Sequence, residues 1–79
     1  MTYLNLPCVP IGTYVRVRKL HAKGSIRRRL LDMGLTKGAK IICLYQSPFG
    51  DPRAYLIRGA VIALRFEEAM QVEVTYADI

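Results

Sequence analysis

The sequence predicts a mainly β fold: a small five-stranded barrel with one short helix inserted after the first strand. Apolar and polar side chains alternate along several short segments, which is the period-two pattern of half-buried strands, and only one longer segment has helical spacing. A chain of 79 residues forms one domain, residues 1–79, with no room for a second layer. Because closure leaves no strand edge exposed, we predict an SH3-like barrel first and the OB-fold, also five-stranded, second.

Residues 13–20 give the clearest expected strand. Val15 and Val17 point to one side, while Arg16 and Arg18 point to the other. This alternation is typical of an antiparallel strand with one face on the core and one face in water. The other expected strands are residues 40–46, 54–58, 61–65 and 71–76.

Three further segments are expected to connect these strands. Residues 47–52 combine serine, proline, glycine and aspartate, which is the composition of a turn. Gly59 and Ala60 separate two strands by two residues, which is the spacing of a tight hairpin. Residues 65–70 are expected to form one helical turn before the last strand.

The helix is expected to begin at Ser25, whose hydroxyl can accept a hydrogen bond from an amide of the first turn. Ile26, Leu30 and Met33 then recur at i, i+4 and i+7 and form one apolar face. Gly34 suits the left-handed position that ends a helix. A helix this short is marginal alone, so packing must hold it in place.

The formal net charge of +6 and the isoelectric point near 9.8 permit an acidic partner without choosing one. The basic residues are scattered, and residues 27–29 form the single run. Nucleic-acid binding by a small barrel usually adds aromatic side chains that stack on bases. The five tyrosines are spread one per segment, so nucleic acid is a disfavoured partner.

The residue inventory argues against an enzyme and against a metal centre within one chain. One histidine and six carboxylates provide no recognisable set of nucleophile, base and orienting group. Cys8, His21 and Cys43 lack metal-ligand spacing, and we interpret Cys43 as a buried thiol in a strand. No metal or cofactor is therefore expected to be required. A weak Fe²⁺ or Zn²⁺ site shared between subunits, using His21 or Cys8, remains open.

The chain has no long apolar run and no signal-peptide pattern. We therefore expect a soluble cytoplasmic protein without membrane insertion. A homo-oligomer that pairs through a strand edge stays open.

Phe49 is the main candidate for protein binding. It lies in the turn at 47–52, where its neighbours can hardly bury a large aromatic ring. Aromatic side chains and arginines are enriched in protein interfaces. The alternative is that Phe49 folds back over the barrel end as a lid on the core, and the sequence does not decide between the two.

Several segments, taken in order along the chain, carry a resemblance to a known family: residues 29–38, 47–52, 58–65, 68–69 and 72–74, with Leu4, Leu6 and Gly12 fitting the family's opening. The family that they resemble is FeoA, small cytosolic proteins of the bacterial ferrous iron uptake system. The resemblance implies an SH3-like barrel with the helix after the first strand, similar to the C-terminal domain of the DtxR repressors. It implies as partner the membrane transporter FeoB, with its cytosolic GTP-binding domain.

These observations together predict a non-enzymatic accessory or regulatory protein of ferrous iron uptake that acts by protein–protein contact. The alternatives are a nucleic-acid-binding SH3-like or OB-type barrel and a metal-sensing domain. The family pattern supplies no catalytic or metal-ligand residues. Phe49 and the arginine run depart from it, so the partner surface is expected to be particular to this chain. The residues predicted to contact the partner are Arg27, Arg28, Arg29, Phe49 and Asp51.

Overall fold

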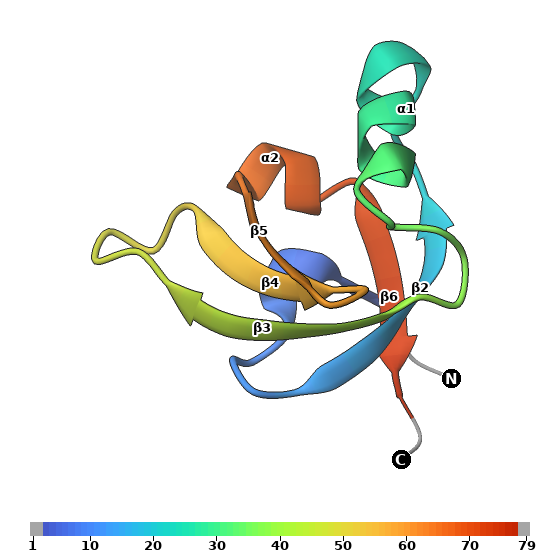
Figure 1. The fold of residues 1–79 in the computed structure, drawn as a ribbon. Coiled ribbons are helices and arrows are strands. Elements are labelled where there is room, and N and C mark those ends of the chain that lie inside the picture. Colours follow the sequence, from blue (N-terminus) through green and yellow to red (C-terminus); the bar gives the residue numbers. More distant parts are fainter. Residues whose placement is uncertain (1–2, 78–79) are drawn as a thin grey trace.

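The computed structural model describes residues 3–77 and contains one antiparallel sheet of six strands, in the order β1-β6-β2-β3-β4-β5 (Figure 1). The helices are short, and α1 stands at one end of the sheet (Figure 1). The elements in chain order are β1 (Leu4–Asn5), the 3₁₀ turn η1 (Leu6–Cys8), β2 (Tyr14–Leu20), α1 (Gly24–Asp32), β3 (Lys40–Gln46), β4 (Arg53–Ile57), β5 (Ala60–Leu64), α2 (Phe66–Ala69) and β6 (Val72–Tyr76).

The mainly β architecture with a short helix is confirmed, but the count of five strands is wrong. The additional strand is β1, in which Leu4 pairs with Val74 and Asn5 with Glu73 of β6. Two residues are too few to display an alternating pattern, and Pro7 ends the extended run immediately. The helix α1 consequently follows the second strand rather than the first.

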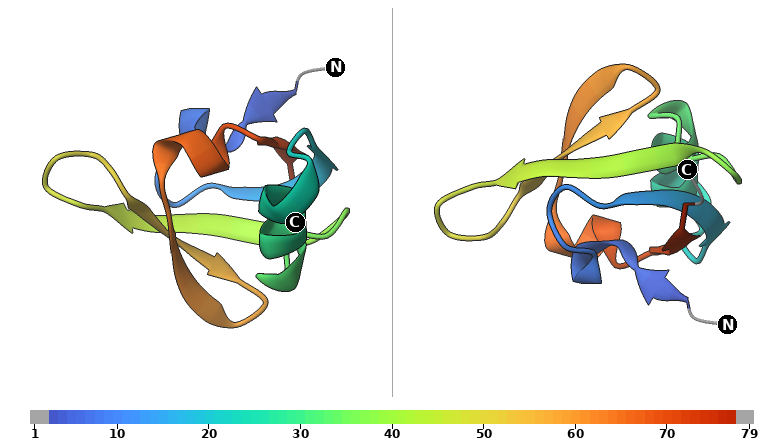
Figure 2. Two further views of the ribbon diagram at one scale, coloured as in Figure 1. Left: turned by 90° about the horizontal axis from the view of Figure 1, so that it is seen from above. Right: turned by 90° about the horizontal axis from the view of Figure 1, so that it is seen from below.

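The strongly curved sheet wraps around a single apolar core (Figure 2). The inward positions of β2 were correctly predicted, since Val15 and Val17 are buried. Tyr55 on β4 is the largest fully buried side chain, and Cys43, its partner in register on β3, is also buried, as predicted. Burial raises the pKa of both the Cys43 thiol and the Tyr55 hydroxyl.

The predicted end of α1 is confirmed, whereas its predicted start is wrong. Lys23 occupies the N-cap position and Ser25 lies inside the first turn, so its hydroxyl does not cap the helix. At the other end, Gly34 has φ +101°. The Leu35 amide donates to the Leu30 carbonyl (3.1 Å) and the Gly34 amide to the Leu31 carbonyl (2.9 Å). These two bonds satisfy carbonyls that a helix end leaves free, as in a Schellman motif.

The hairpin between β4 and β5 lies one residue earlier than predicted. Its turn consists of Arg58 and Gly59, which both have positive φ, +50° and +83°. Two such residues are the requirement of a type I′ turn, whose twist matches the twist of paired strands. The Arg58 side chain donates to the Gly34 carbonyl (3.3 Å) and to Thr36 Oγ1 (2.7 Å). These contacts hold a bulky residue in a conformation that usually requires glycine or asparagine.

Candidate functional site

The three arginines of α1 differ in their partners within the described chain. Arg27 Nη1 donates to the Leu20 carbonyl at the end of β2, at 3.2 Å. Arg29 forms an ion pair with Glu68 of α2 and so ties the two helices together. Arg28 is exposed, and its side chain makes no hydrogen bond or ion pair to residues 3–77. Arg28 is therefore the member of the run whose charge is most available to a partner.

The apolar face predicted for α1 is only partly used. Leu30 is fully buried and Met33 packs against the core, but Ile26 is 51% exposed. The reason is geometrical, because α1 projects from the end of the barrel with its first turn farthest from the sheet (Figure 1). Only its C-terminal half reaches the core, so Ile26 is surface rather than core.

Phe49 is 95% exposed, and the interpretation of its ring as a lid on the core is therefore wrong. The turn around it is well ordered by its own hydrogen bonds. The Gly50 amide donates to the Ser47 carbonyl at 2.8 Å, and Ser47 Oγ donates to the Asp51 carbonyl at 2.7 Å. A structured turn thus presents a single aromatic ring to solvent.

Asp51 has a structural role that the sequence does not reveal. Its Oδ1 accepts a hydrogen bond from the Phe66 amide at 2.9 Å, while Glu68 Oε1 accepts one from the Arg65 amide at 3.1 Å. Amides at the start of a helix lack partners within it, so these carboxylates satisfy the first donors of α2. Asp51 is therefore already engaged within the chain.

The structure does not bring the two halves of the predicted contact surface together. The helix α1 stands at one end of the molecule, and the turn at 47–52 extends from the other end, in Figures 1 and 2 alike. Arg27, Arg28 and Arg29 thus form one patch, and Phe49 forms a second one. The assignment of either patch to a partner stays a prediction.

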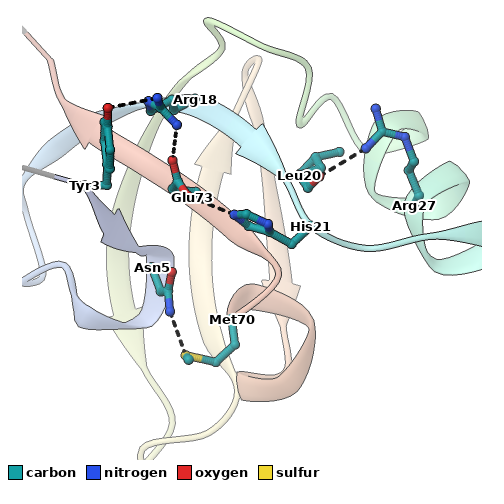
Figure 3. A network of polar contacts seen from close by, with 8 residues as sticks. All are labelled: Tyr3, Asn5, Arg18, Leu20, His21, Arg27, Met70 and Glu73. Atoms are coloured by element: carbon teal, nitrogen blue, oxygen red, sulfur yellow. Dashed lines mark hydrogen bonds and ion pairs between the residues drawn. The ribbon is translucent and has the colours of Figure 1, made fainter.

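A network of polar contacts joins β2 and β6 to Tyr3, which precedes β1, and to His21, which follows β2 (Figure 3). Glu73 on β6 accepts hydrogen bonds from Arg18 and, at 2.8 Å, from His21 Nε2. Arg18 also donates to the Tyr3 hydroxyl at 2.9 Å, and its guanidinium lies 3.6 Å from the centre of the Tyr3 ring. The hydrogen bond from His21, aided by Arg18, lowers the pKa of Glu73. His21 therefore serves to link β2 to β6.

The candidate metal ligands of the sequence do not form a cluster. Across residues 3–77, no three His, Cys, Asp or Glu side chains gather closely enough to hold a metal ion. Cys8 is exposed, Cys43 lies in the core, and His21 is bound to Glu73. The described residues thus do not fit a metal centre held by one copy of this chain.

A groove between α1 and β2 was not anticipated from the sequence. It has a volume of about 570 Å³. Its lining combines four apolar and four basic side chains: Val17, Leu20, Leu31, Leu35, Arg18, Lys19, Arg27 and Lys37. The available signal was the i, i+4 spacing of Arg27 and Leu31, which places both on one side of the helix. That spacing does not show that β2 lies on the other side of the groove from α1.

Comparisons with known proteins place this chain in a family. A family model described as the FeoA domain matches residues 4–76. A fusion protein of Porphyromonas gingivalis, described as Fe(2+) transport protein A fused to the Fe(2+) transporter FeoB, is 32% identical over 63 residues. The match covers 80% of this chain, which spans only 8% of the length of that relative.

Two solved structures support the same relationship. The NMR structure of a FeoA-like protein from Clostridium acetobutylicum is 34% identical, with a TM-score of 0.87 over 96% of this chain and 90% of that one. The crystal structure of Stenotrophomonas maltophilia FeoA, which is described as an SH3 domain protein complexed with zinc, is 30% identical with a TM-score of 0.80. That match covers 91% of this chain and 89% of the other.

None of the helices within residues 3–77 has the length and apolar character needed to cross a membrane. The curved antiparallel sheet, the helix stop at Gly34 and the family match over residues 4–76 agree with one another. This chain belongs to the FeoA family and has its SH3-like fold.

Proposed function

We propose that this protein is a non-enzymatic accessory protein of ferrous iron uptake that acts by direct contact with a FeoB-type membrane transporter. The observation that carries this proposal is the Porphyromonas gingivalis relative, in which a related segment is joined to a FeoB transporter in one polypeptide. Covalent linkage converts a binding event into an intramolecular one and raises its effective concentration. Natural fusion of this kind is expected for two proteins that work in contact.

The contact would require no bound cofactor. The residues around α1 supply charge and apolar area rather than a reactive group, and His21 and Glu73 are engaged with each other. We therefore propose that the protein acts by occupying a surface of the transporter, for which the cytosolic GTP-binding domain is the first candidate.

The arginines of α1 (residues 27–29) and the Phe49 ring lie far apart (Figure 1), so the contribution of each to partner binding can be measured separately. Arg28 is exposed without an internal partner in the described chain, and its reversal to glutamate leaves the core contacts of Leu30 intact. Phe49 is almost entirely in solvent, so its truncation removes no core packing. Both substitutions should therefore leave the fold unchanged.

The test is a titration of the purified full chain against the cytosolic part of the FeoB-type transporter from the same organism. We expect saturable binding that weakens about fivefold or more in Arg28→Glu or in Phe49→Ala, because interface truncations above about 1 kcal/mol mark the residues that matter. Absence of binding by the unmodified chain contradicts the proposed function. Unchanged binding by a variant that carries both Arg28→Glu and Phe49→Ala contradicts only the assignment of the contact surface.

A further inference from the structure

The groove between α1 and β2, called here the α1–β2 groove, arises where two strands separate. β2 pairs with β3 up to Arg16 opposite Lys40, and the Val17 backbone makes the last bonds, to Ala39 and Gly38. Beyond Val17, this side of β2 no longer pairs with β3 or with the residues that precede it. The helix α1 stands there instead, connected by the hydrogen bond from Arg27 to the Leu20 carbonyl.

Half of the residues that line the α1–β2 groove are apolar, but most of these belong to the core. Val17, Leu20 and Leu35 are buried, so they offer almost no accessible surface to a ligand. Leu31 forms part of the wall and is 36% exposed, although it is a large aliphatic side chain on a helix. An exposed leucine can gain by binding an apolar group, since its accessible apolar surface would then leave water.

Within the described part of the chain, the charged side chains that line the α1–β2 groove are all basic. Arg18 is paired with Glu73 and is therefore compensated. Lys19 and Lys37 are exposed and form no ion pair with residues 3–77, and Arg27 uses one guanidinium nitrogen on a neutral carbonyl. Within residues 3–77, no aspartate or glutamate lines the groove. Three uncompensated cations thus line the groove together with the exposed Leu31.

We propose that the α1–β2 groove binds an acidic peptide segment of the transporter, in which carboxylates meet Lys19, Arg27 and Lys37 while an apolar side chain rests on Leu31. The identity of the partner rests on the proposed function, whereas the peptide chemistry rests on the groove itself. Complementary charge fixes orientation and speeds association, and the apolar contact supplies affinity that salt does not screen.

The lining favours a peptide over a nucleic acid. Sequence-tolerant binding of single strands combines cations with aromatic side chains on which bases stack. Among the described residues, no aromatic side chain lines the α1–β2 groove. The exposed apolar residue there is Leu31, whose aliphatic side chain complements a leucine or isoleucine rather than the face of a base.

The first experiment measures affinity of the full chain for the cytosolic part of the transporter. The groove variant is Lys19→Glu with Lys37→Glu, which lowers the net charge from +6 to +2 because each substitution removes two charges. The matched control is Lys40→Glu with Arg65→Glu, which makes the same change outside the groove. We expect the groove variant to lose at least tenfold in affinity and the control to lose less than about threefold.

Leu31→Ser tests the apolar contact and should weaken binding about fivefold or more, with a ratio to the unmodified chain that stays constant as salt rises. Equal losses in the groove variant and its control overturn the proposal, because binding would then follow net charge alone. Unfolding temperatures of all variants exclude a loss of fold as the cause.

A second experiment separates the groove from the proposed function. Chemical shifts of the ¹⁵N-labelled full chain are followed during titration with a synthetic peptide of alternating glutamate and leucine, and with single-stranded DNA. Saturable shifts confined to residues 17–20, 27–31 and 35–37 with the peptide support the groove even if the transporter does not bind. Shifts spread over all basic residues, or stronger binding of DNA, overturn it.

Discussion

Replacement of Gly34 by alanine should remove about half or more of the stability of this domain. Gly34 ends α1 with φ +101°, outside the region that residues with a Cβ normally occupy. A Cβ built there lies 2.9 Å from Cδ of Arg58 and 3.3 Å from Cγ2 of Ile57. The substitution therefore combines backbone strain with a steric clash.

The magnitude follows from these two terms. A left-handed conformation costs a non-glycine residue about 1–2 kcal/mol. Displacing Arg58 gives up its exposed hydrogen bonds to Gly34 and Thr36, worth together about 1 kcal/mol. The sum is about 2–3 kcal/mol. A domain of this size has roughly 3–5 kcal/mol in total, and the unfolding temperature should fall by about 10–20 °C.

Thermal and urea unfolding, followed by circular dichroism, measures the effect. Gly38→Ala is the matched control, since Gly38 also has positive φ, +86°, but has nothing within 4 Å of its added Cβ. Gly38→Ala should therefore lose only the stability that the left-handed backbone conformation costs a non-glycine residue. In Gly34→Ala with Arg58→Ala, the loss should fall short of the sum of the single losses by about 1 kcal/mol. Equal losses in Gly34→Ala and Gly38→Ala would refute the explanation by close approach.

Three further substitutions test the core and the polar network. Leu30→Ala should cost about 2–5 kcal/mol, because Leu30 is fully buried and anchors α1; a smaller loss in urea unfolding would mean that α1 contributes little to the fold. Tyr55→Phe should leave stability unchanged or raise it by up to about 1 kcal/mol, since the buried Tyr55 hydroxyl has no hydrogen-bond partner within residues 3–77; a clear loss would reveal a partner, either the nearby Arg53 or a bound water. The folded pKa of Glu73 is lowered by His21 and Arg18, so its contribution is present above the unfolded pKa and lost as pH falls through the folded value. Stability should therefore decline below about pH 4.5. Glu73→Gln should flatten that decline, whereas the same substitution at an unpaired carboxylate should leave the decline unchanged.

Alternation and glycine placement predicted most of the fold because they record local physics. Val15 and Val17 had to face the core together, and Gly34 was the one residue that could end α1 in a left-handed conformation. The misplaced hairpin has a tertiary origin. Arg58 adopts positive φ while its side chain donates to Gly34 and Thr36, which lie in a distant segment. No local pattern contains that information.

The candidate site was predictable only in part. The composition of the turn at 47–52 left two interpretations of Phe49 open, an exposed interface side chain and a lid on the core, and only the structure decides for exposure. The role of Asp51 depends on the Phe66 amide, which lies fifteen positions later in the sequence. The α1–β2 groove depends on three segments that meet only after β3 leaves β2 at Val17. Separation between segments, rather than weak local signals, limited the prediction.

The helix α1 combines two roles at neighbouring positions, and this determines how substitutions in it must be interpreted. Leu30 faces the core, whereas Arg28 is in solvent and Leu31 borders the groove. Loss of partner binding after Leu30→Ala would therefore report unfolding as much as contact. Loss of binding after Arg28→Glu or Leu31→Ser, at an unchanged unfolding temperature, can arise only from the surface. Core and surface residues thus alternate within one helical turn. Unfolding temperature and partner affinity must therefore both be measured on each variant before a loss of binding can identify the interface.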